Sequence, residues 1–145
     1  MSEPNSREKF LRAIKKCLSD VDIHFQKAID ELDQVGRASL GLGMTPILGR
    51  YGIRDPSKHY TNALIELDLA EKSLQPLRKR LGDGTVNASH FTSEKALVML
   101  RDLCEFDYDI LVNLLANKRG KESVGLRLVE LDRLAVELLN LVAHS

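Results

Sequence analysis

The stretch LRAIKKCLSDVDIHFQKAIDELDQV, residues 11–35, decides the fold class. Its apolar residues follow one another at steps of three and four without a slip, which is the heptad spacing of an α-helix packed along one face. A β-strand repeats every two residues and cannot produce this pattern. The residues of this apolar seam are Leu11, Ile14, Leu18, Val21, Phe25, Ala28, Leu32 and Val35. A capping box at Asn5 and Glu8 and a stop at Gly36 predict a helix over about residues 6–36.

A second helix is predicted over about residues 56–81. Asp55 and Pro56 form the N-cap and first-turn pair that is typical of a helix start. Pro76 lies inside this segment, where it removes one backbone hydrogen bond, so we expect a kink or a break there.

The third and fourth helices are predicted over about 92–118 and 122–143, with Gly120 as the turn between them. Four amphipathic helices of this length favour an all-α four-helix bundle with heptad-like packing, forming a single domain over residues 1–145. Beyond the heptads, no internal repeat is expected.

The segment SLGLGMTPILGRYGIRDP, residues 39–56, is a long connection that is both Gly-rich and apolar. Three interpretations stay open: a cover over the end or side of the bundle, a binding loop or lid, or a segment that a partner orders. Its length allows the first two helices to be parallel or antiparallel. A phosphate loop is excluded, because Pro46 stands where a dinucleotide fingerprint has its third glycine and no strand precedes it.

Composition argues against several classes of partner. Lys plus Arg equals Asp plus Glu at 21 each, so no net field attracts nucleic acid, and Trp is absent. No apolar run reaches the roughly 18 residues of a membrane span, and no signal peptide is visible at the N-terminus. With only two cysteines, we expect a cytoplasmic protein without a disulfide scaffold.

Asp107 is the anomaly of the third helix, because it occupies a seam position between Cys104 and Leu111. A buried carboxylate without a partner is costly. Asp107 therefore predicts a general acid, base or ligand contact, or a polar residue that fixes helix register, or a helix rotated enough to bring it to water. No Glu-x-x-His pair is present and the paired carboxylates point away from the seams, so no metal, cofactor or catalytic set is expected.

The fourth helix carries more apolar surface than a bundle helix needs. Val129 and Val136 widen its seam on one flank, and Leu134 and Leu141 widen it on the other. Such a surplus predicts contact with a second copy or another protein. The apolar residues of the long connection are expected to join that interface, namely Leu42, Ile47 and Leu48.

The leading hypothesis is therefore a non-catalytic interaction or assembly module that self-associates. The alternative is a small-ligand-binding bundle or bundle enzyme, with a pocket near Asp107 closed by residues 39–56 and lined by His24, Tyr51 and Tyr60. A weaker third hypothesis is anion binding at a basic pole, where the start of the first helix meets the end of the second.

Overall fold

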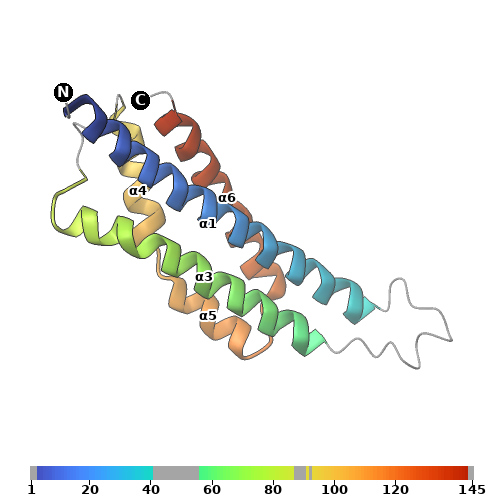
Figure 1. Cartoon of the computed structure of the whole chain (residues 1–145). Helices are drawn as coiled ribbons and strands as arrows, with labels where there is room; N and C mark the ends of the chain where they lie inside the picture. The colour runs from blue at the N-terminus through green and yellow to red at the C-terminus, as the bar shows by residue number, and fades with distance from the viewer. Residues whose placement is uncertain (1–2, 41–55, 87–90, 92, 144–145) are drawn as a thin grey trace.

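The computed structural model describes residues 3–40, 56–86, 91 and 93–143, which form an all-α four-helix bundle (Figure 1). Five helical segments build its four rods, because one rod is divided in two. The segments are α1 (Glu3–Leu40), α3 (Pro56–Gly82), α4 (Glu94–Glu105), α5 (Tyr108–Ala116) and α6 (Lys121–Ala143). The fold class predicted from the heptad seams is confirmed.

The rods run up, down, up and down, as Figure 1 shows. Helix α1 packs against α3 and α6, while α4 and α5 pack against the other sides of α3 and α6. Helices α1 and α3 are antiparallel, since His24 contacts Glu66 and Glu31 contacts His59. This settles the direction that the length of the connection left open.

The apolar seams of α1 and α6 form the core as predicted. All eight seam residues of α1 are buried, and the seam of α6 is buried from Val124 to Val142. Full burial of each large aliphatic side chain contributes about 1.5–3 kcal/mol, so these rows dominate the stability of the bundle. Helix α3 continues through Pro76 to Gly82 without the break that the proline suggested.

The prediction of one continuous third helix is wrong. The rod is interrupted at Phe106 and Asp107, which separate α4 from α5. Asp107 lies in solvent at the N-cap of α5, where its Oδ1 accepts a hydrogen bond of 3.2 Å from the backbone N–H of Asp109. Tyr108 takes the buried place instead. Aspartate caps a helix start better than it fills a core, so the interruption removes the buried charge that a continuous helix would have required.

Two side chains compensate the backbone at this interruption. The hydroxyl of Tyr108 donates to the carbonyl oxygen of Leu103 at 2.7 Å, and Nε of Arg78 donates to the carbonyl oxygen of Cys104 at 2.9 Å. The guanidinium of Arg78 also lies 5.5 Å from the centre of the Tyr108 ring, which stacks on Phe25 of α1. Carbonyls at the end of α4 thus gain donors from α5 and α3.

Tyr108→Phe removes one of these donors and leaves the Leu103 carbonyl buried without it. We expect a loss of about 1–3 kcal/mol in the free energy of unfolding, measured by urea denaturation. Tyr60→Phe is the matched control, because Tyr60 is also buried but no hydrogen bond of its hydroxyl is found among the described residues. Equal losses in the two variants would contradict this role for the Tyr108 hydroxyl.

Candidate functional site

The residues predicted to line a ligand pocket are not brought together. Asp107 is exposed and caps α5. Of the three alternatives for this residue, the two that bury it in the core are wrong, and it reaches water as in the third, through a break in the helix and not through a rotation. His24 is half-buried on α1 and contacts Glu66, whereas Tyr60 is buried in the core. Tyr51 lies outside the described residues. None of the three grooves found among the described residues is lined by Asp107.

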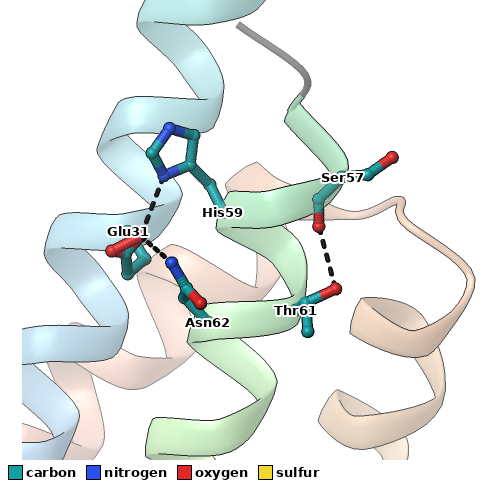
Figure 2. Close-up of polar contacts among 5 residues, drawn as sticks. All are labelled: Glu31, Ser57, His59, Thr61 and Asn62. Atoms are coloured by element: carbon teal, nitrogen blue, oxygen red, sulfur yellow. Dashed lines mark hydrogen bonds and ion pairs between the residues drawn. The ribbon is translucent and has the colours of Figure 1, made fainter.

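Two histidine–glutamate pairs join α1 to α3. Nδ1 of His24 lies 2.8 Å from Oε1 of Glu66, and Nδ1 of His59 lies 2.8 Å from Oε1 of Glu31. Nδ2 of Asn62 donates to the same Glu31 oxygen at 3.1 Å, so this carboxylate lies between two side chains of α3 (Figure 2). Burial alone would raise the pKa of Glu31, but the hydrogen bonds from His59 and Asn62 outweigh it and lower that pKa.

An internal repeat relates the two pairs, contrary to the expectation of none. HFQKAIDELD, residues 24–33, and HYTNALIELD, residues 59–68, are identical at five of ten positions: His, Ala, Glu, Leu and Asp. The offset of 35 residues is five heptads, so the repeat lies within the heptad pattern itself. Since the helices are antiparallel, the histidine of each repeat meets the glutamate of the other, around the fully buried Ala28 and Ala63.

A polar groove of about 330 Å³ lies on the outer side of this helix pair. Acidic groups predominate among its lining residues, which are Lys27, Asp30, Glu31, Asn62, Ile65 and Glu66. Within the described part of the chain, no three histidine, cysteine or acidic side chains are grouped to hold a metal ion. The histidine–glutamate pairs join the two helices, and each fixes their register from one end of the repeat.

The α1–α6 contact contains a buried carboxyl group that the sequence analysis missed. Asp132 is only 6% exposed, and Nε2 of Gln26 donates to its Oδ2 at 2.5 Å. Its Oδ1 is buried without a hydrogen-bond partner among the described residues. Burial, followed by the neighbouring Asp22, raises the pKa of Asp132 to about 7. The sequence did carry a signal, because Asp132 lies between Val129 and Val136 on an apolar flank of α6.

An apolar groove of about 440 Å³ follows the same pair of helices toward the start of α6. Apolar residues and a glycine form most of its lining: Ile29, Leu32, Gly125, Leu126 and Val129, with Asp33, Lys121 and Glu122 as the charged members. A Cβ atom at Gly125 would meet nothing within 4 Å. Glycine inside a helix costs about 0.5–1 kcal/mol relative to alanine, and here it leaves open space in the groove.

The two predicted flanks of α6 differ in the structure. Val129 and Val136 are exposed, whereas Leu134 and Leu141 are half-buried and pack against the core. The second pair therefore contributes to the bundle itself. The remaining predicted interface residues, Leu42, Ile47 and Leu48, lie outside the described residues.

The basic pole and the cysteines have structural contacts of their own. The guanidinium of Arg80 lies 5.0 Å from the centre of the Phe10 ring, which brings the end of α3 beside the start of α1. Arg78 is committed to the end of α4, as described above. Both cysteines are free, and burial raises the pKa of the Cys104 thiol to about 12, so this thiol stays protonated near neutral pH.

Neither a protein-family model nor a curated protein nor a solved structure matches the chain. Among the described residues, no helix has the length and apolar content that crossing a membrane requires.

Enlarging either alanine at the centre of the repeat is expected to separate α1 from α3. Ala28→Leu and Ala63→Leu should each lower the free energy of unfolding by about 1–3 kcal/mol, and by similar amounts because their surroundings are related. Ala13→Leu is the control, since Ala13 is exposed on α1. Urea denaturation checks all three, and near-neutral changes at positions 28 and 63 would contradict tight packing at this centre.

Proposed function

We propose that this protein is a non-catalytic interaction module that self-associates through the apolar groove between α1 and α6. The observation that carries the proposal is the position of Leu126 and Val129. Both side chains line the groove with Ile29, and Leu126 is 68% exposed, more than any other large apolar side chain that the structure describes. Contiguous exposed apolar surface of this kind marks association sites in soluble proteins.

A second copy of the chain is a suitable occupant, because the groove contains both the exposed Leu126 side chain and open space beside Gly125. In a two-fold dimer the same surface meets itself, so Leu126 of each copy can enter the space beside Gly125 of the other. The charged lining combines Lys121 with Glu122 and Asp33, which allows opposite charges to meet across the axis. The formal net charge of zero adds no general repulsion between copies.

The alternative, a ligand pocket beside Asp107 closed by residues 39–56, is the less supported of the two. Asp107 is an exposed N-cap residue, and the groove at the end of α4 is lined by Cys104 and Glu105 but not by Asp107. The α1–α6 groove supports association better than it supports a small-ligand site, because it is open to solvent and lined by the exposed Leu126.

Leu126→Lys combined with Val129→Lys is expected to abolish self-association at concentrations where the wild-type chain is dimeric. Each lysine removes apolar contact from both halves of a two-fold interface, and about 1.5–3 kcal/mol per buried side chain corresponds to at least a tenfold weaker dimer. Light scattering across a protein concentration series measures the mass, and circular dichroism confirms that the helices remain.

The matched control is Val98→Lys combined with Ile110→Lys, which places the same charges at exposed apolar positions of α4 and α5. This variant should keep the wild-type mass. A wild-type chain that is monomeric over the whole series would overturn the proposal, and so would equal dissociation of the two double variants.

A further inference from the structure

We infer that Asp22 and Asp132 form a proton-controlled latch, in which one shared proton holds α1 against α6. This is a conformational device within a single chain, and it goes beyond self-association. It rests on the burial of a carboxyl group at the contact of two helices, for which the described part of the chain supplies no basic partner.

The geometry leaves one oxygen of Asp132 without a donor. Gln26 of α1 donates to Oδ2, while Oδ1 is buried and has no partner among the described residues. Asp22 precedes Gln26 by four residues, so both lie on the same face of α1 and both act on the Asp132 carboxyl group. A proton shared between the two carboxyl groups supplies the missing hydrogen bond.

A proton suits this position better than a metal ion does. Oδ1 exposes almost no surface, so a hydrated cation has no access to it, and the described residues contain no group of three acidic, histidine or cysteine ligands. We therefore assign a proton, and not a metal ion, to the position beside Oδ1 of Asp132.

Among the described residues, no basic group is found to act on the Asp132 carboxyl group. Helix α1 presents Asp22 and Gln26. Helices α4 and α5, which also pack against α6, bury Cys104 and Tyr108, and burial raises the pKa of both groups so that they stay neutral. No ion pair found in the described part of the chain includes Asp132.

The sign of the pH effect follows from this arrangement. Burial and Asp22 raise the pKa of Asp132 in the folded chain to about 7, whereas the unfolded chain titrates near the ordinary aspartate value of about 4. Between these values the unfolded state binds fewer protons, so the folded state loses stability as the pH rises. Above the folded pKa, Asp132 carries a buried negative charge beside the Asp22 carboxyl group, and the contact of α1 with α6 is the one expected to loosen.

The test is urea denaturation of the wild-type chain and of Asp132→Asn at pH 5, 6, 7 and 8, at one low protein concentration. The asparagine amide mimics the protonated acid and can donate to Asp22. We expect the wild-type unfolding equilibrium constant to rise with pH, by up to about tenfold per unit below pH 7. The profile of Asp132→Asn should lack this component and give the more stable protein at pH 8.

Asp102→Asn is the matched control, because Asp102 is exposed on α4, and its pH profile should follow the wild type. Parallel profiles for the wild type and Asp132→Asn would overturn the latch. If Asp132→Asn does not fold, carbon-detected NMR of the wild-type carboxyl groups decides, since a latch requires an aspartate that titrates far above 4. Light scattering at the same pH values tests self-association separately. A chain that is monomeric but shows the pH effect would support the latch and contradict self-association.

Discussion

The antiparallel pairing of α1 with α3 is the constraint on which the rest of the bundle depends. Ala28 and Ala63 are fully buried at its centre, and a histidine–glutamate pair joins the helices at each end of the repeat. Because the pairs are reciprocal, sliding one helix along the other breaks both at once. The register of α1 against α3 then decides which residues α1 presents to α6, including Asp22 and Gln26.

The interrupted rod follows from the same packing. Tyr108 stacks on Phe25 of α1 and lies beside Arg78 of α3, so the ring occupies the space where those two helices meet the rod. An unbroken helix would instead direct Asp107 into that space. The cost of breaking the helix is limited, because Tyr108 and Arg78 donate to the carbonyls of Leu103 and Cys104.

The heptad spacing of the sequence predicted which rows of residues are buried. It did not predict the features that depend on contacts between particular side chains. The seams from Leu11 to Val35 and from Val124 to Val142 are buried as expected, because a heptad row must face the core. The heptad pattern could not show that the helix would be interrupted at Asp107, since capping depends on the local backbone. Nor could it show that Asp132 faces Gln26, because such pairing needs the relative height of two helices. The repeat centred on Ala28 and Ala63 could have been read from the sequence. Its offset of 35 residues is a whole number of heptads, so it is hard to tell apart from the heptad pattern.

The contacts that α1 makes with α3 and with α6 differ in how their polar groups are paired. On the α3 side, the glutamates of the repeat lie at the half-exposed edge, each within 2.8 Å of a histidine nitrogen. On the α6 side, Asp132 is buried, one of its oxygens has no hydrogen-bond partner in the described part of the chain, and Gly125 leaves open space beside α6. Both features lower stability, and an alanine or a leucine would fill either position more favourably. The α3 contact is therefore suited to holding the fold, and the α6 contact is suited to change, whether by proton uptake or by the docking of a second chain.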